Sequence, residues 1–241
     1  MSKQLLSISA DAKTIKGQKY GFLTGILYLA PGTISGYQTC PMAKLAGCEK
    51  ACLYSAGRGA FNNVQQARIA KTKRFFEHRQ EFMMDLVHSI EALKRKAAKA
   101  GLKPLVRLNG TSDIQWEKIR FQPYADSADS VTIFDLFPDV QFYDYTKIAN
   151  RSALPANYDL TFSYSGIDSY QPYVAKARAN ASLSRIAVVF DKVENIPSEF
   201  MGRKVVSGDN SDIRHLDDIG TVVALYAKGQ AKKDTSGFVV R

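Results

Sequence analysis

The chain has 241 residues and carries 33 Lys and Arg against 23 Asp and Glu, which gives a formal net charge of +10. With 45% hydrophobic and 23% charged residues, the composition excludes an intrinsically disordered chain, a collagen-like repeat and a disulfide-rich secreted scaffold. No apolar run reaches the ~18 residues of a membrane span, and the N-terminus lacks the apolar core of a secretory signal. We therefore expect a cytoplasmic protein that begins near Met1 and has no membrane partner.

The first predicted element is a buried strand within residues 20–31, where aromatic and apolar residues run up to a Pro-Gly pair. A loop follows, and from Asn63 the chain has helical spacing, with Asn62 or Asn63 as the N-cap. Gly101 is the predicted helix stop, and a break near residues 78–80 leaves open whether there are two helices. The apolar positions recur at helical spacing at Phe82, Leu86, Ile90, Leu93 and Ala97.

Beyond Gly101, short apolar strands alternate with helical segments. The further predicted strands are 104–110, 139–145, 158–166, 184–191, 203–208 and 221–227, and the predicted helices among them are 172–181 and 211–220. This alternation predicts a mostly parallel sheet covered by helices on both faces. Without a repeat or linker, residues 1–241 are expected to form a single α/β domain. Its sheet would be a (β/α) barrel, a partial barrel or an open doubly wound sheet.

The loop predicted at residues 32–60 contains the chain's 3 cysteines, Cys40, Cys48 and Cys52. An odd number of cysteines without an export signal argues against a disulfide framework. Thiolates select soft metals, and three of them fit a [4Fe-4S] cluster with one iron free of protein thiolate, or a [3Fe-4S] cluster. A small molecule would then have access to the open iron. Two alternatives stay open: a zinc site, which needs a fourth ligand, and buried cysteines without a metal.

Polar residues follow the carboxyl ends of the predicted strands, where α/β proteins bind their ligands. The cysteine loop follows such an end too, so we expect these residues to line a pocket beside it. Shortly after Cys52, Arg58 lies between two glycines just before a helix, a pattern suited to clamping a carboxylate or phosphate. The other candidate ligand-binding residues are Asn109, Thr111, Asp113, Asp144 and Lys147.

Half of the positive excess falls on the predicted helical region 64–101, which holds nine basic and four acidic residues. A basic helical face is the electrostatic footprint of a nucleic-acid-binding protein, although charges on helices are also common on solvated faces. The second functional hypothesis is therefore a non-enzymatic nucleic-acid-binding or regulatory protein with a structural or redox-sensing metal site. The basic residues are Arg68, Lys71, Lys73, Arg74, Arg79, Lys94, Arg95, Lys96 and Lys99.

A three-cysteine loop after the first strand, followed by helices, resembles the radical S-adenosylmethionine (SAM) superfamily in arrangement. Cys48-x3-Cys52 matches part of its C-x3-C-x2-C signature, and the remaining thiol lies upstream at Cys40. The resemblance implies a partial (β/α) barrel, SAM bound at the open iron and a redox enzyme.

Most of the chain is similar to the "gene product 88" family of tailed phages. The similar text includes LSISADAKTIKG, TGILYLAP, CPMAKLAGCEKACLYSAGRGAFNNVQQAR, VRLNGTSDIQWE and FPDVQFYDYTK. This resemblance implies a phage protein that works in the cytoplasm of a bacterial host. It also implies that the cysteines and the NGTSD and YDYTK segments are the signature of the family.

Overall fold

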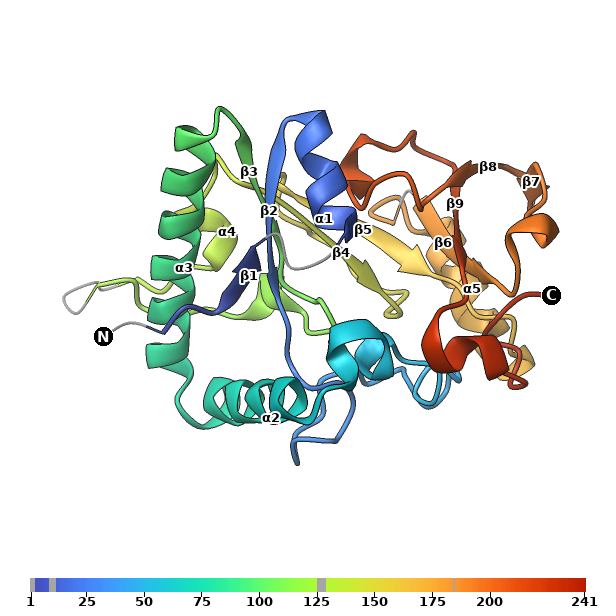
Figure 1. The fold of residues 1–241 in the computed structure, drawn as a ribbon, viewed down its shortest axis with the longest axis horizontal. Helices are drawn as coiled ribbons and strands as arrows, with labels where there is room; N and C mark the ends of the chain where they lie inside the picture. Colours follow the sequence, from blue (N-terminus) through green and yellow to red (C-terminus); the bar gives the residue numbers. More distant parts are fainter. Residues whose placement is uncertain (1–2, 9–11, 125–128, 184) are drawn as a thin grey trace.

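The computed structural model describes residues 3–8, 12–124, 129–183 and 185–241. Its centre is a nine-stranded sheet with the order β1-β2-β3-β4-β5-β6-β9-β8-β7 (Figure 1). The run from β2 to β8 is parallel throughout, while β1 and β7 pair antiparallel at the two edges. The strands are β1 (Leu6–Ile8), β2 (Phe22–Leu27), β3 (Lys103–Arg107), β4 (Gln141–Thr146), β5 (Tyr158–Ser163), β6 (Arg185–Phe190), β7 (Glu199–Phe200), β8 (Arg203–Ser207) and β9 (Val222–Tyr226).

The seven strands predicted from the sequence are all present, and the single, mostly parallel α/β domain is confirmed. The predicted start of one strand, Ser184, lies outside the described residues. The sequence prediction missed the two short edge strands, β1 and β7. Among the strands that the structure describes, the pairing leaves β1 and β7 as separate ends, so the ladder is not closed.

The predicted helical region forms two helices, α2 (Asn62–Glu77) and α3 (Arg79–Lys99), which are divided at His78. The predicted N-cap at Asn62 or Asn63 is wrong. Phe61 has the extended backbone that an N-cap needs, with ψ of 133°, and it makes no side-chain capping bond. Just beyond α3, Gly101 adopts the left-handed φ of +66° and stops the helix as predicted.

Helix α3 covers β1, β2 and β3 with its predicted apolar stripe (Figure 1). The five residues of that stripe have 0% exposure, from Phe82 to Ala97. A Cβ atom at Gly25 of β2 would lie 3.0 Å from Leu93 Cδ2, so glycine allows this helix to approach the sheet closely. Three further helices complete the layers: α1 (Ala12–Gly17) against β2, α4 (Ile133–Leu136) and α5 (Gln171–Ala179).

The helix predicted at 211–220 is wrong, since only the 3-10 turn η7 (Arg214–Leu216) forms there. Polar contacts of Asp212 explain the difference. Its carboxylate lies 3.0 Å from Arg107 Nη1 and accepts hydrogen bonds from the hydroxyls of Tyr143 and Tyr145. The segment therefore lies across β4 and β5 instead of coiling into a helix. The helix predicted at 172–181 is confirmed as α5.

The parallel strands place the cysteine loop and the loops after β3 and β4 at one end of the sheet. The blue and cyan loop lies beside α2 and the red C-terminal segment (Figure 1). The end of α3 lies at the opposite, amino end, because Lys103 follows it closely and pairs with Phe22 at the start of β2. Within the described residues, no helix combines the length and the apolar character needed to span a membrane.

Candidate functional site

The cysteine loop is built from turns and from the 3-10 segments η2 (Leu53–Ser55) and η3 (Gly57–Ala60). Thr39 anchors its start, since its hydroxyl donates to Ala30 O at 2.7 Å and its carbonyl accepts from Asp113 N at 2.8 Å. In the middle of the loop, Gly47 has φ of +67°, and a Cβ there would lie 2.3 Å from Ile167 Cδ1. Glycine is therefore required at this position.

The three thiols lie close enough together to influence one another electrostatically. Charge on Cys52 raises the pKa of both Cys40 and Cys48. Cys40 Sγ lies 3.8 Å from Thr111 O, Cys48 Sγ lies 3.7 Å from Ala43 O, and Cys52 Sγ accepts a hydrogen bond from the Tyr54 amide at 3.5 Å. None of the three is disulfide-bonded in the described chain. Cys40 and Cys48 therefore both lie within electrostatic range of Cys52.

Burial raises the pKa of every one of these thiols, that of Cys40 to about 12. Each thiol also has a neighbour that favours the thiolate by lowering its pKa: the Gly32 backbone for Cys40, Lys147 for Cys48, and the Tyr54 backbone with Arg68 for Cys52. Among the residues that the structure describes, no group of three or more His, Cys, Asp or Glu side chains is arranged to hold a metal ion.

Two buried cations flank the loop, and neither forms an ion pair with a carboxylate in the described chain. Lys147 Nζ donates to three neutral oxygens at 2.9–3.0 Å, two on Ser163 and one on Tyr164. On α2, Arg68 is 9% exposed and lies over the rings of Tyr28 and Tyr54 at 4.7 and 5.6 Å. Its Nη1 has no hydrogen-bond partner among the described residues. The positive charge of Lys147 therefore favours the thiolate form of Cys48, and that of Arg68 favours the thiolate form of Cys52.

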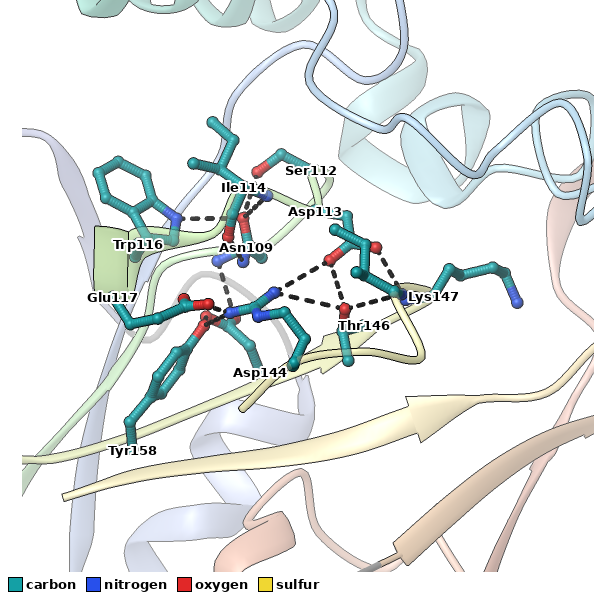
Figure 2. A network of polar contacts seen from close by, with 12 residues as sticks. Asn109, Ser112, Asp113, Ile114, Trp116, Glu117, Asp144, Thr146, Lys147 and Tyr158 are labelled. Atoms are coloured by element: carbon teal, nitrogen blue, oxygen red, sulfur yellow. Dashed lines mark hydrogen bonds and ion pairs between the residues drawn. The ribbon is translucent and has the colours of Figure 1, made fainter. Parts of the chain in front are cut away.

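Of the predicted pocket residues, Asn109 organises its own loop. Its side-chain oxygen accepts hydrogen bonds from the Ser112 hydroxyl, the Ile114 amide and Trp116 Nε1, all within 3.1 Å (Figure 2). Its side-chain nitrogen donates to Ile114 O. Thr111 approaches the cysteines through its carbonyl, while its hydroxyl donates to Leu29 O at 2.5 Å. Asn109 therefore fixes the backbone of the loop after β3.

Asp113 and Arg151 join the loops after β3 and β4. Asp113 accepts hydrogen bonds from the Thr146 hydroxyl at 2.8 Å and from the Lys147 amide at 2.7 Å (Figure 2). The fully buried Arg151 lies 2.6 Å from Glu117 and 3.6 Å from Asp113. In Figure 2 the Lys147 side chain points away from this network. Asp113 thus holds the Lys147 backbone while the ammonium group extends to β5.

Asp144 lies beneath this network, with 0% exposure, and accepts hydrogen bonds from the Asn109 amide and the Tyr158 hydroxyl. Burial raises its pKa from 3.8 to about 7, although Arg107 and both hydrogen bonds lower it. The structure therefore places Asp144 in the interior of the network, away from the thiols, with both carboxylate oxygens occupied.

The raised pKa of Asp144 predicts a pH-dependent stability. Between about pH 4 and 7 the folded protein keeps a proton that the unfolded chain has released, so the free energy of unfolding falls as pH rises. Asp144→Asn carries no such proton. Its free energy of unfolding should decline less between about pH 5 and pH 8 than the parent's, by on the order of 2 kcal/mol. Urea titrations of both proteins measure this, and parallel pH profiles would contradict it.

Arg58 is exposed in η3, and its side chain makes no recorded hydrogen bond or ion pair with the described residues. The glycine after it serves packing, because a Cβ at Gly59 would lie 2.6 Å from Tyr54 O and 3.2 Å from Arg68 Nη1. The structure therefore does not bring Arg58 into contact with the thiols or with the polar network.

The basic helical region is less exposed than its charge suggests. Arg68 is buried, Arg74 pairs with Asp85 and Lys94 pairs with Asp139. Lys71 is half-buried and donates to Leu5 O, and Arg79 packs on Phe75. The basic residues that remain exposed are Lys73 on α2 and Arg95, Lys96 and Lys99 near the end of α3.

The chain was compared with protein-family models, with curated proteins and with solved structures. The searches of curated proteins and of solved structures found no match. None of these findings supports the resemblance to the radical SAM superfamily. The family model described as "Gene product 88" matches residues 4–241, nearly the whole chain, including the cysteine loop and the polar network. The chain therefore belongs to the gene product 88 family.

Proposed function

We propose that Cys40, Cys48 and Cys52 bind an iron–sulfur cluster, either [4Fe-4S] or [3Fe-4S], at the carboxyl end of the sheet. One observation carries the proposal: the loop with the three cysteines lies beside two buried cations, Lys147 and Arg68, and neither forms an ion pair with a carboxylate of the described residues. Buried cations of this kind are costly unless an anion compensates them. Thiolates bound to iron supply that negative charge, and each thiolate of a cubane binds a different iron atom.

In this proposal the chain's own residues have distinct roles. The three cysteines hold the cluster, while Lys147 beside Cys48 and Arg68 beside Cys52 balance its negative charge. Asp113 fixes the backbone of Lys147, and so sets where the ammonium group reaches. The cluster, when bound, would supply electron transfer or an iron open to a small molecule.

We also propose that the sheet forms a partial (β/α) barrel. From β2 to β6 each parallel strand pairs with the next one in the sequence, without the reversal of order that defines a doubly wound sheet. This order supports a partial (β/α) barrel with its ligand at the carboxyl end. For a redox enzyme with this arrangement of strands, SAM is the candidate ligand of the open iron. Membership of the phage family suggests that the protein works in the cytoplasm of a bacterial host.

Anaerobic purification and metal analysis test the cluster. We expect brown protein with absorbance near ~400 nm, three to four irons per chain and matching sulfide, as thiolate-bound clusters give. Colourless protein containing one zinc and no iron would contradict the proposal. Incubation with SAM and a reductant is a separate test. Absence of SAM cleavage in iron-loaded protein would remove the SAM chemistry and leave the cluster.

Nucleic-acid binding is the second candidate, and one observation favours it. Arg95, Lys96 and Lys99 are exposed near the end of α3, next to the exposed Lys103 at the start of β3. Phosphate contacts release counterions, so affinity for a DNA or RNA oligonucleotide should fall steeply as salt rises from ~50 to ~200 mM. No binding at the lower salt concentration would exclude this candidate.

A further inference from the structure

A cavity of about 260 Å³ lies beside Cys40. It shares only Asp113 and Ile114 with the residues labelled in Figure 2. Four segments distant in the sequence line it: the chain on both sides of Cys40, the junction of α2 and α3, the loop after β3, and Ile148 in the loop after β4. Its floor is apolar, and Asp113 on the wall is compensated by Arg151. The apolar lining is Phe75, Phe76, Ile114, Ile119 and Ile148, together with Pro41.

Arg79 gives this cavity a positive charge that the described chain does not neutralise. Its Nε donates to Phe75 O at 2.8 Å, and its guanidinium lies 4.2 Å above the Phe75 ring and 5.6 Å from the Phe76 ring. No carboxylate pairs with it in the described residues, and its terminal nitrogens have no recorded acceptor there. Burial lowers its pKa, because the charged form is partly removed from water.

The aromatic side chains of the lining, Phe75 and Phe76, are packed against each other and against Tyr37. Tyr37 stacks on Phe76 with ring centroids 4.5 Å apart and an angle of 3°, and its hydroxyl donates to Glu77. Phe75 packs edge-on against Phe76 at 5.0 Å. The guanidinium therefore lies beside an apolar lining that a hydrophobic ring can contact, while its terminal nitrogens can pair with an acidic group on that ring. Lys118 adds a second, exposed cation to the lining.

We propose that this cavity binds a small planar aromatic anion, whose carboxylate or phosphate pairs with the terminal nitrogens of Arg79 while its ring packs against the partly buried Phe76, Ile114 and Ile119. The volume is below the ~300–1,000 Å³ of sites for drug-sized ligands, so a single-ring acid is the right size. The site lies next to Cys40 through Thr39 and Pro41, but its occupation does not depend on a metal.

Ligand-observed NMR with benzoate, phenyl phosphate and the neutral analogue benzamide tests the proposal on iron-loaded and on iron-free protein. We expect benzoate or phenyl phosphate to bind with Kd of about 1 mM, and the tighter of the two identifies the acidic group. Arg79→Gln should raise that Kd by about tenfold, the loss expected for a charge-assisted pair, and leave benzamide unchanged. Arg79→Lys should restore part of the affinity. Lys50→Gln, in the cysteine loop outside this cavity, is the matched control.

Two results would overturn the proposal: no binding of either anion up to about 20 mM, or Arg79→Gln changing Kd by less than about twofold in a protein with the parent's circular dichroism spectrum. If Arg79→Gln does not fold, Phe76→Leu replaces it, since loss of the ring face should weaken both anions and benzamide. Measuring the iron content of the same samples shows whether anion binding depends on the cluster. Anion binding by iron-free protein supports the cavity whatever the metal.

Discussion

If the proposed cluster forms, Cys40→Ala purified anaerobically should contain much less iron than the parent protein and lose the absorbance near ~400 nm. Cys40 is the decisive cysteine, because it lies eight positions before Cys48, outside the short Cys48-x3-Cys52 spacing. Its thiol lies 3.8 Å from Thr111 O, so it joins the cysteine loop to the loop after β3. If all three thiolates hold one cluster, removing this one removes a ligand from the same group.

Cys48→Ala and Cys52→Ala should lose iron to a similar extent, and the double variants should be no worse than the single ones, because effects on one shared site do not add. Metal binding also contributes to folding, so each variant should be less stable than the iron-loaded parent. Met42→Leu is the matched control, since it removes a sulfur atom from the same loop without removing a thiolate. Full iron and colour in Cys40→Ala would exclude the three-thiolate site.

Arg151→Met should lower the free energy of unfolding by about 3–5 kcal/mol, the usual cost of breaking a buried ion pair from one side. Arg151 is 1% exposed and lies 2.6 Å from Glu117. Methionine fills much of the same volume but leaves the carboxylates of Glu117 and Asp113 buried without their cation. Urea denaturation followed by circular dichroism measures the change.

Lys94→Met is the control for Arg151→Met. It breaks the ion pair of Lys94 with Asp139, whose side chain is 60% exposed, and should cost at most about 1 kcal/mol. Adding Glu117→Gln to Arg151→Met should recover part of the loss, because the amide removes one unpaired charge. If Arg151→Met is no less stable than Lys94→Met, the buried network contributes little to the fold.

The strands were predictable because buried parallel strands read as short, nearly continuous apolar runs bounded by turn residues. Residues 104–110 and 221–227 are of this kind, and both form strands. The edge strands β1 and β7 have three and two residues, too few to show a period. The helix predicted at 211–220 failed because Asp212 binds Tyr143 and Tyr145, contacts that depend on the folded sheet.

The sequence predicts the cysteines and Lys147 as candidate site residues but places Arg68 among the residues of a basic helical face. The signal that reveals Arg68 is its spacing. Thr72 and Phe75 follow it at four and seven positions, and all three residues face the interior of the protein. The cavity beside Cys40 has no comparable signal, because its lining comes from four segments far apart in the chain.

The order of the last strands has a consequence for how the protein folds. β8 precedes β9 in the chain but lies outside it, so β8 can join the main sheet only through β9, once β9 has paired with β6. Before it pairs with β9, β8 has only its two-residue pairing with β7, and an isolated hairpin is marginal in water. Pulse-labelling hydrogen exchange should therefore find the amides of β8 protected no earlier than those of β9. A slow insertion of β9 would leave the edge of β6 exposed to strands of other chains.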